Sequence, residues 1–548
     1  MITCNSVFSV ILFKYPLFII TLTYLAFSQP ENRFLPFDWV QYRQTGKINS
    51  ISFSNRYAYI GTQLGGVQRF NLLSNRFEEP ITRAQGLRSN SINAVHRASN
   101  GVLWVGTSYG IEYSLSEEGD WTSINRDFLG LPFGETIYRI GESDQDIWLE
   151  TSTLFYRLDP ISGVVTGRMS NPDVSVLWSS GLIRFQIDLS NLLFEYSISN
   201  GWMTDFSSLI NPNGKQMRVT TIATSIRNEI WLGTEDGTFF IGDNTMKTFS
   251  PFRFTLANND IQYIEGKDSF WLGGRLNQYS SGVTYFDIDR SICDVFTFNE
   301  NINMDRNSIY SIIKLNNEIW FGGEDGIIVY NTKKDFWRTY NVNIGTNKPL
   351  INSFLKINNE IWLATNNGIV ILNKNNKSRI NNEIVDYFNN NTVYDLSNTE
   401  NHIFITTEVG LYIYDNNNNK IYDLESFGYK TKNFILPSNH FDYTAITKDE
   451  KYMYFANQSG IIVFNFKDRS WSNAVESSIY GSQEVKSIAI DKEKIFIATI
   501  NGVVEFDMNN NTLEIYNYKF FGSINDIYIK GKKIWLGTSE GLISYRYK

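Results

Sequence analysis

A motif of eight residues recurs along the chain and constrains the fold more than any other feature. Residues 230–237 read IWLGTEDG, residues 534–541 read IWLGTSEG, and residues 319–326 read IWFGGEDG. Looser copies are centred on Tyr59, Trp104, Trp148, Trp271, Trp362, Phe404, Tyr454 and Phe496, with a degenerate copy at Phe185. Twelve copies at intervals of roughly 40 to 50 residues indicate a repeat architecture in which each copy belongs to one small unit.

A second signature stands before most of the aromatic centres, at a distance of ten to twelve residues. It is a short segment with an apolar residue at each end, as in residues 92–95, 309–312, 351–354 and 524–527, and even the degenerate copy keeps it in residues 174–177. Turn residues separate the segments of each unit, and no helical period is sustained. Each unit therefore reads as four strands, which predicts an all-β chain of tandem β-propellers with about twelve four-stranded blades.

The repeated residues have a mechanical explanation. The aromatic residue suits packing between neighbouring blades. The residue two places later is Gly or Ala in nine of twelve copies, which permits close approach of two sheets. The Gly six places after the aromatic residue, also present in nine of twelve copies, suits a tight turn with positive φ. We interpret these residues as scaffold and not as ligand contacts.

The two ends of the repeat array complement each other. Residues 38–42 (DWVQY) read as a fourth strand without its blade, whereas residues 541–546 (GLISYR) read as a third strand with no fourth strand after it. In a closed ring the first strand would complete the last blade, so that no sheet edge remains open. Because propellers usually have four to eight blades, two rings are expected. We favour six blades in each ring, with one propeller over residues 36–290 and another over 291–548; seven and five, or five and seven, is the alternative.

The first 28 residues differ from the rest. Lys14 is the only charged residue before Glu31, residues 17–27 are nearly all apolar, and small residues precede an abruptly polar stretch. This pattern predicts a secretory signal peptide over residues 1–28, with an uncleaved N-terminal anchor as the alternative. We expect a location in the periplasm or at the cell surface. Of the two cysteines, Cys4 would leave with the signal peptide, so Cys293 would have no partner for a disulfide.

The repeat resembles a known family. The pattern IWLGTxxGL, together with the phrase GLRSNSINAV at residues 86–95, is similar to the two-component regulator propeller repeat. The resemblance implies an exported propeller, and in that family such propellers form sensor halves of hybrid sensor kinases, some of which recognise oligosaccharides. Related propellers also occur as stand-alone exported proteins, including a component of a secretion system. No kinase, DNA-binding module or second apolar span is recognisable in this chain, so a signalling receptor is not implied.

The sequence offers little catalytic chemistry. Its three histidines, His96, His402 and His440, lack metal-ligand spacing, and no nucleophile elbow or nucleotide-binding motif is present. The acidic, asparagine-rich segment 415–419 lacks the Gly and Glu of a calcium loop. The net charge of −8 gives no reason to expect nucleic acid as a partner. We expect no cofactor, no metal site and no enzymatic activity.

If a ligand site exists, the turns on one propeller face are where we expect it. The charged, amide and aromatic residues in those turns are Arg88, Asn90, Tyr109, Glu235, Asp236, Arg275, Asp305, Arg306, Glu324, Asp325 and Asn367. Such side chains suit sugar or peptide binding, although solvated turn residues would look the same. The favoured function is a non-enzymatic binding propeller for a glycan or peptide, acting with a separate membrane protein. The alternatives are a structural component of an envelope or secretion complex and an enzyme acting on polysaccharide.

Overall fold

The computed structural model describes residues 35, 37–116, 119–185, 187–205, 208–276, 282–298, 307–324, 326–344, 348–435, 437, 446–448, 451–457 and 459–547. The proposed signal peptide lies outside these residues. The described residues form twelve β-sheets, eleven of which have four or five strands. The prediction of an all-β chain of tandem propellers is confirmed. Among the described residues, no helix has the length and apolar character needed to cross a membrane.

The aromatic centres occupy the same place in nearly every sheet. Eleven of the twelve lie in the second strand of their own repeat, which pairs with the first strand of that repeat, as Trp104 does in β7 (Leu103–Thr107). Phe185 is the exception, since it lies in no strand and its side chain is 77% exposed. The repeat therefore predicts the sheets wherever its central aromatic residue can be buried.

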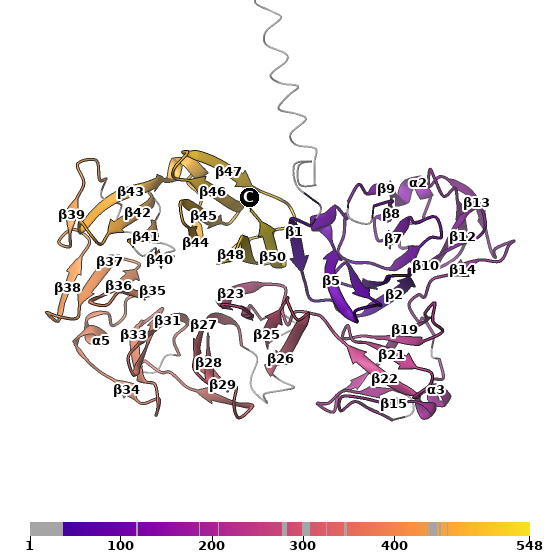
Figure 1. Cartoon of the computed structure of the whole chain (residues 1–548), viewed down its shortest axis with the longest axis horizontal. Coiled ribbons are helices and arrows are strands. Elements are labelled where there is room, and N and C mark those ends of the chain that lie inside the picture. The colour runs from indigo at the N-terminus through magenta and orange to yellow at the C-terminus, as the bar shows by residue number, and fades with distance from the viewer. Residues whose placement is uncertain are drawn as a thin grey trace, which may run out of the picture.

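The first ring contains four sheets, which Figure 1 shows in indigo to magenta on the right. Their strands are β2 (Ile48–Phe53), β3 (Tyr57–Thr62), β4 (Val67–Asn71), β5 (Arg76–Ile81); β6 (Ala94–Arg97), β7, β8 (Gly110–Ser114), β9 (Thr122–Asn125); β10 (Ile137–Glu142), β11 (Ile147–Thr151), β12 (Phe155–Leu158), β13 (Val165–Met169), β14 (Leu177–Trp178); and β15 (Ser197–Ile198), β19 (Val219–Thr224), β20 (Ile230–Thr234), β21 (Phe239–Asp243), β22 (Thr248–Phe252). A small sheet of β16 (Met203–Thr204), β17 (Leu209–Ile210) and β18 (Gln216–Met217) and the short helices α2 (Arg126–Leu129) and α3 (Ser190–Glu195) accompany them.

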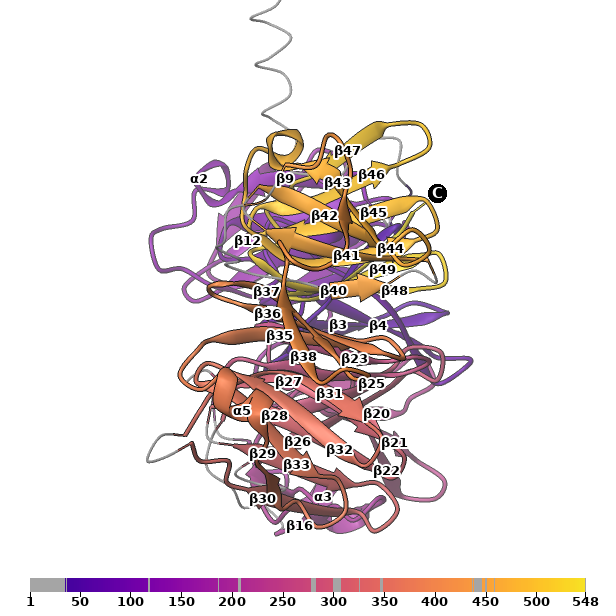
Figure 2. The same cartoon turned by 90° about the vertical axis from the view of Figure 1, so that its left-hand side faces the viewer.

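The second ring contains seven sheets, shown in magenta to yellow on the left of Figure 1. Their strands are β23 (Ile261–Gly266), β24 (Phe270–Gly274), β25 (Gly282–Asp287), β26 (Ile292–Thr297); β27 (Ile309–Leu315), β28 (Glu318–Gly323), β29 (Ile327–Asn331), β30 (Phe336–Tyr340); β31 (Ile351–Ile357), β32 (Glu360–Thr365), β33 (Gly368–Asn373), β34 (Arg379–Ile380); β35 (Val393–Asn398), β36 (His402–Thr407), β37 (Gly410–Asp415), β38 (Lys420–Asp423); β39 (Tyr429–Lys430), β40 (Ile446–Lys448), β41 (Tyr452–Asn457), β42 (Gly460–Asn465), β43 (Ser470–Glu476); β44 (Val485–Asp491), β45 (Lys494–Thr499), β46 (Gly502–Asp507), β47 (Thr512–Tyr516); and β48 (Ile524–Lys530), β49 (Lys533–Thr538), β50 (Gly541–Arg546), β1 (Trp39–Tyr42). Helix α5 (Glu383–Tyr387) lies between β34 and β35 in the chain. In the side view of Figure 2 this ring stands in front of the first.

The Gly or Ala two places after most aromatic centres shows which sheets are neighbours, because the adjacent sheet packs closely against it. A Cβ placed on Gly233, in the last sheet of the first ring, would lie 2.8 Å from the Cγ2 atom of Ile48 in the first sheet. A Cβ placed on Gly537 would lie 3.1 Å from the Cγ2 atom of Ile261. Strands β19 and β2 are in contact, as are β48 and β23. These contacts join the last sheet of each ring to its own first sheet.

The expected equal division of six and six blades is wrong. The expected boundary between residues 290 and 291 falls between β25 and β26, which are hydrogen-bonded neighbours in one sheet. The chain order is instead five repeats, of which the fourth forms no sheet of its own, and then seven repeats. The equal division failed because it followed the equal length of the two halves of the chain, whereas the first ring closes after the fifth repeat.

The degenerate fourth repeat crosses the axis of the first ring. Its expected first strand, residues 174–177, contributes only to β14, which pairs with β10 of the preceding sheet. Ser180 then donates its N–H to the carbonyl of Ile51 at 3.2 Å, and Thr221 donates its hydroxyl to the carbonyl of Gly181 at 2.9 Å. We call residues 178–183 the axial strap, because their hydrogen bonds reach sheets on opposite sides of this ring.

The terminal latch is confirmed. Strand β1 pairs antiparallel with β50, in the register Trp39 to Tyr545 and Tyr42 to Leu542, and so completes the last sheet. The rings of Trp39 and Tyr545 stack with centroids 4.1 Å apart. The chain therefore begins in the second ring, builds the first ring from β2 to β22, and returns to finish the second.

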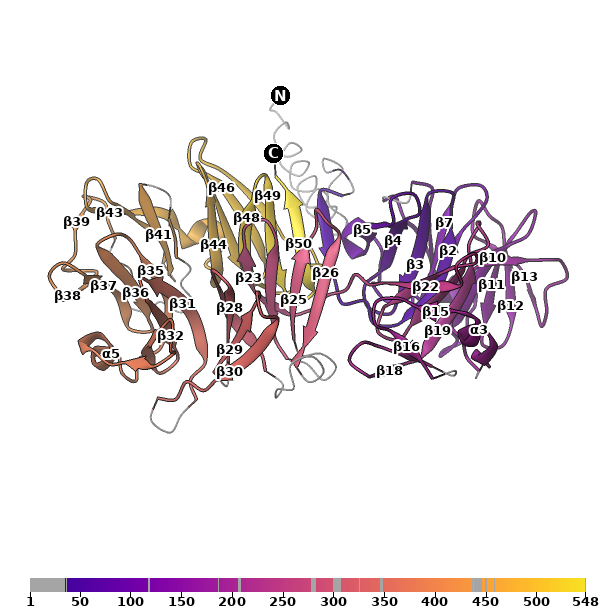
Figure 3. The same ribbon diagram turned by 60° about the horizontal axis from the view of Figure 1, so that its bottom comes forward.

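One hydrophobic cluster joins the two rings, which lie side by side in Figures 1 and 3. It contains Phe70 and Phe77 of the first ring and Phe286 and Trp535 of the second. Phe254, in the connection between β22 and β23, stacks on Phe77 with centroids 5.2 Å apart and also packs near Phe286. The rings thus share buried apolar surface, which couples their stability.

Candidate functional site

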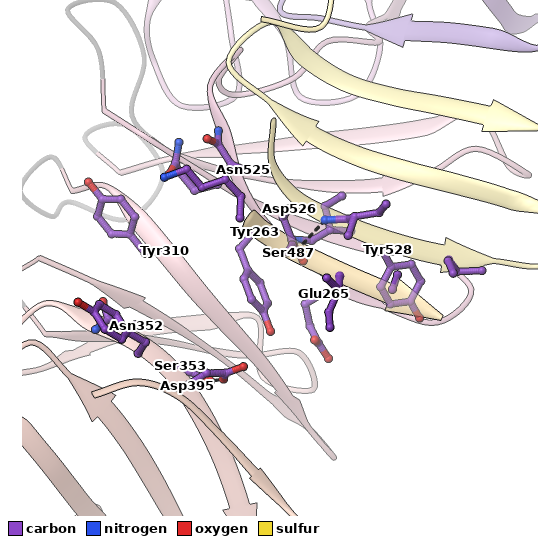
Figure 4. Close-up of a pocket in the computed structure, with 18 of the residues that line it drawn as sticks. Tyr263, Glu265, Tyr310, Asn352, Ser353, Asp395, Ser487, Asn525, Asp526 and Tyr528 are labelled. Carbon is purple, nitrogen blue, oxygen red and sulfur yellow. Dashed lines mark hydrogen bonds between the residues drawn. The ribbon is translucent and has the colours of Figure 1, made fainter. Parts of the chain in front are cut away.

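A polar cavity of about 520 Å³ lies where the first strands of the second ring converge (Figure 4). Six of the seven sheets contribute to its wall, through β23, β27, β31, β35, β44 and β48. The polar residues of the wall are Gln262, Tyr263, Glu265, Tyr310, Asn352, Ser353, Tyr394, Asp395, Lys486, Ser487, Asn525, Asp526 and Tyr528. Its size is within the range of small-ligand sites, which is roughly 300 to 1,000 Å³.

A recurrent bulge explains why polar residues face this cavity. In β27 the register shifts between Ile309 and Ser311, and the same shift occurs near the start of each of the other five lining strands. A bulge places two consecutive residues of one strand opposite a single residue of its partner. Ile309 and Ile312 stay buried between sheets, while Tyr310 between them reaches the cavity. The residues between the two apolar ends of the first strand are therefore the source of the site.

Asp526 is a half-buried carboxylate of the cavity wall. It accepts hydrogen bonds from the N–H of Ile264 at 2.9 Å, the hydroxyl of Ser487 at 3.0 Å and the N–H of Ile527 at 2.8 Å. Burial raises the pKa of Asp526 to about 6, despite these donors, and the nearby charge of Asp395 raises it further. The hydrogen bonds hold this carboxyl group in place at the axis.

Two further carboxylates share the cavity. Asp395 accepts hydrogen bonds from the hydroxyl of Ser353 at 2.5 Å and from the N–H of Leu396 at 2.8 Å. Burial raises the pKa of Glu265 to about 7, and the charge of Asp526 adds to this shift. Glu265 therefore senses the negative charge of Asp526.

Tyr263 stands among these acids. Figure 4 shows its hydroxyl directed into the space that the carboxyl groups of Glu265 and Asp395 also face. Burial holds the pKa of Tyr263 well above its usual range, and the charges of Glu265, Asp526 and Asp395 push it in the same direction. The cavity thus offers neutral phenols beside anionic acceptors.

Among the described residues of the wall, Lys486 carries positive charge, and its Nζ atom lies 2.8 Å from the Oε1 atom of Glu484. No group of three or more His, Cys, Asp or Glu residues that could hold a metal ion occurs among the described residues. The wall is suited to accepting hydrogen bonds and to pairing with positive charge.

The candidate residues in the turns of the first ring do not form one site. Arg88 and Tyr109 are exposed, whereas Asn90 is buried and donates its side-chain amide to the Oε1 atom of Gln41 at 3.2 Å. Glu235 is exposed, and its Oε1 atom accepts the N–H of Arg218 at 3.3 Å. Asp236 accepts the hydroxyl of Thr234 at 2.6 Å and so braces its own turn.

The candidate residues of the second ring are also dispersed. Arg275 is exposed and lies 3.9 Å from Asp260, and Asn367 caps its turn by donating its N–H to the hydroxyl of Thr365. Glu324 accepts a hydrogen bond from the hydroxyl of Tyr310 at 2.9 Å, which connects it to the cavity wall. Asp305, Arg306 and Asp325 lie outside the described residues.

The residues that line the cavity were missed by the sequence-based choice of turns. Their signal was present in the first-strand signature, whose two central positions hold Tyr394 and Asp395 in one repeat and Asn525 and Asp526 in another. When the two central residues of such a strand are polar and its two ends are apolar and buried, the pattern indicates that polar side chains line the space around the ring axis.

Comparisons with known proteins support the family of the repeat. Residues 86–109 match the family model described as two component regulator propeller, which confirms the predicted repeat. No curated protein matches the chain.

Several solved structures align with this chain. The extracellular domain of BT4673 from B. thetaiotaomicron, described as a hybrid two component system, aligns at 14% identity over 91% of this chain and 70% of that chain, with a TM-score of 0.43. The corresponding domain of BT3049 from the same organism aligns at 16% identity over 89% of this chain and 73% of that chain, also with a TM-score of 0.43. BamB from Moraxella catarrhalis aligns at 10% identity over 58% of this chain and 92% of its own, with a TM-score of 0.36.

Proposed function

We propose that the protein is an exported, non-enzymatic binding propeller and that the axial cavity of the second ring receives its ligand. The observation that supports this proposal is the polar cavity of about 520 Å³, whose wall contains residues from six sheets. Aromatic, amide and carboxylate side chains gathered in one concave site are typical of binding sites for polar small molecules and peptide side chains. The signal-peptide pattern of residues 1–28 supports export.

The partner of such a protein is a glycan, a peptide or a molecule of similar polarity, and a separate membrane protein would respond to it. A glycan and peptide array probed with the purified protein, followed by titration of each hit, tests this function. Tyr310→Ala removes a ring from the cavity wall and should weaken binding of a cavity ligand by about tenfold, as loss of a central aromatic contact does. Tyr109→Ala, at an exposed turn of the first ring, is the matched control and should leave affinity unchanged.

A structural role in an envelope complex is the second candidate, and one observation favours it. Large apolar side chains stand exposed on the first ring, among them Phe128 at 82% and Phe133 at 103%. Capture from an envelope fraction, with Phe128→Ser and Phe133→Ser as variants, separates the two functions. One stable partner lost in these variants, together with no ligand on the arrays, would replace the binding function by a structural one.

A polysaccharide-acting enzyme is tested on the same material. Carboxyl groups with raised pKa, such as Glu265, are what a general acid requires. Release of reducing ends from a polysaccharide by the wild type, abolished in Glu265→Gln, would contradict the non-enzymatic proposal.

A further inference from the structure

We infer that the ligand of the axial cavity is an organic cation with two or more ammonium groups on a flexible aliphatic chain. This inference rests on the proposed function and names the chemical class that the same site would take. Its basis is the imbalance of charge in the wall, where Glu265, Asp395 and Asp526 face a cavity whose single lysine lies beside a glutamate outside the wall.

The charged and titratable groups can be followed strand by strand. Strand β23 presents Tyr263 and Glu265, β35 presents Tyr394 and Asp395, and β48 presents Asp526 and Tyr528. Strand β27 presents Tyr310 and also carries Lys314, whose backbone N–H and positive charge both lower the pKa of Glu265 and so partly oppose burial. Strand β44 presents Lys486, and the lining residues of β31 are uncharged. The side chains of β40 are outside the described part of the structure. Within the described wall the carboxylates outnumber the cation.

The wall carboxylates repel one another across the cavity. Asp395 and Asp526 lie close enough for the charge of the first to raise the pKa of the second, and Asp526 acts on Glu265 in the same way. A positive charge between them would remove this repulsion and would gain from the low dielectric of a site enclosed by six sheets. Binding of a cation is therefore the event that best relieves the electrostatic strain of this wall.

The spacing of the acids selects the kind of cation. Each carboxylate comes from a different sheet, and Asp395 and Asp526 are fixed by their own hydrogen bonds to Ser353 and Ser487. They form no group that could close around one metal ion. A chain with separated ammonium groups can meet them one by one, and its methylene segments can lie against the rings of Tyr263 and Tyr310, which also attract cations.

Protonation of the wall carboxylates makes the expected affinity for the cation depend on pH. A cation pairs with ionised carboxylates, whereas burial holds the pKa of Glu265 at about 7 and that of Asp526 at about 6 in the free protein. Affinity should therefore rise from pH 5.5 to pH 8 and then level off, and binding near pH 6.5 should release protons.

The test is calorimetric titration of the full chain with spermidine at pH 8, with trilysine as a second ligand and a neutral triethylene glycol as a ligand control. Glu265→Gln and Asp395→Asn should each weaken binding of the cations by about tenfold, as removal of one close charge pair does. Glu195→Gln removes the same charge from the surface of the first ring, where that side chain is 61% exposed, and should bind like the wild type. The ratio of spermidine to trilysine affinity shows whether the ammonium groups come from a free amine or a peptide.

The outcomes separate the inference from the function on which it rests. Binding of neutral glycans or peptides that is lost in Tyr310→Ala, without binding of spermidine or trilysine, overturns the cation inference and leaves the binding function standing. Cation binding that is equal in Glu195→Gln and Asp395→Asn overturns it as well, because the charge would then act from outside the cavity. Absence of any ligand in every class rejects both proposals.

Discussion

The position two residues after each aromatic centre shows how single residues determine which sheets can meet. In nine of the twelve copies this position is Gly or Ala, and a Cβ on Gly61 would lie only 2.9 Å from the Cγ2 atom of Ile92. In the third sheet the position holds Glu150, which pairs with Arg139 and Arg184. No complete sheet follows there, so a long buried side chain has room. Glu150 stands in the last sheet before the repeat that forms no blade of its own.

Adding one methyl group at such a position should strain the contact between two sheets. Gly273→Ala places a Cβ 2.6 Å from the Cγ2 atom of Ile309, and we expect a loss of about 1 to 3 kcal/mol of unfolding free energy, the usual cost of overpacking. Gly167→Ala is the control, because its Cβ would meet the flexible ends of two side chains, Met169 at 3.2 Å and Arg157 at 3.4 Å. Urea denaturation measures both; equal midpoints for the two variants would contradict the role of close approach.

His96 should make the protein sensitive to acid. It is buried beside the axial strap, with its Nδ1 atom 2.8 Å from the hydroxyl of Ser179, and burial lowers its pKa to about 4, although the charge of Glu142 opposes this shift. The unfolded chain takes up a proton on this residue near pH 6.5 and the folded chain only near pH 4, so stability falls as pH drops through that window. The expected contribution is roughly 3 kcal/mol.

The measurement compares wild type and His96→Gln by urea denaturation at several pH values between 7 and 4. The other titrating groups are common to both proteins, so the difference between the two curves isolates His96. Parallel curves would show that His96 keeps its ordinary pKa.

At the scale of elements, strands and the latch could be predicted, but the site and the fourth repeat could not. Buried aromatic residues and turn glycines recur with enough regularity to place Trp104 or Trp320 in a second strand without a structure. The inward direction of Asp395 or Asp526 depends on a bulge, which shifts the facing of two residues and has no strong residue signature. The turn residues that the sequence favoured are polar because turns are solvated, and this property does not distinguish a site.

Strand β1 should contribute much of the stability that closing the second ring provides. Trp39 is fully buried and stacks on Tyr545, so Trp39→Ala removes about 3 to 5 kcal/mol, the range for a buried tryptophan. Leu35→Ala, just before the strand at a side chain that is 72% exposed, should change stability by less than about 0.5 kcal/mol. Chemical denaturation followed by tryptophan fluorescence checks both. A Trp39→Ala protein as stable as the Leu35→Ala protein would show that the latch is dispensable.

At the scale of the whole molecule, contacts between sheets decide where one ring ends and the other begins. The sequence of a single repeat does not reveal these contacts. Gly233 looks like every other glycine of its class, and the sequence does not say whether it meets the isoleucine of the next repeat, Ile261, or that of the first, Ile48. The structure places it against Ile48, and so the chain turns back to close the first ring.

The shared cluster predicts that the two rings unfold together. Calorimetry of the wild type should show one transition. Phe254→Ala removes the ring that stacks on Phe77, should cost about 3 to 5 kcal/mol, and should separate the transition into two. Phe388→Ala, a fully buried residue of the second ring outside this cluster, should lower the melting temperature without the separation. Two transitions already present in the wild type would show that the cluster does not couple the rings.

The pairing of β1 with β50 has a consequence for synthesis. During translation or export the chain appears from its N-terminus, so β1 must wait with an unpaired edge until almost every other residue has emerged. The first ring can close in the meantime, because all of its strands follow β1 and precede β23. A chain that stops early would therefore present a finished first ring beside an open arc, and that exposed edge is what a protease or chaperone would recognise as incomplete.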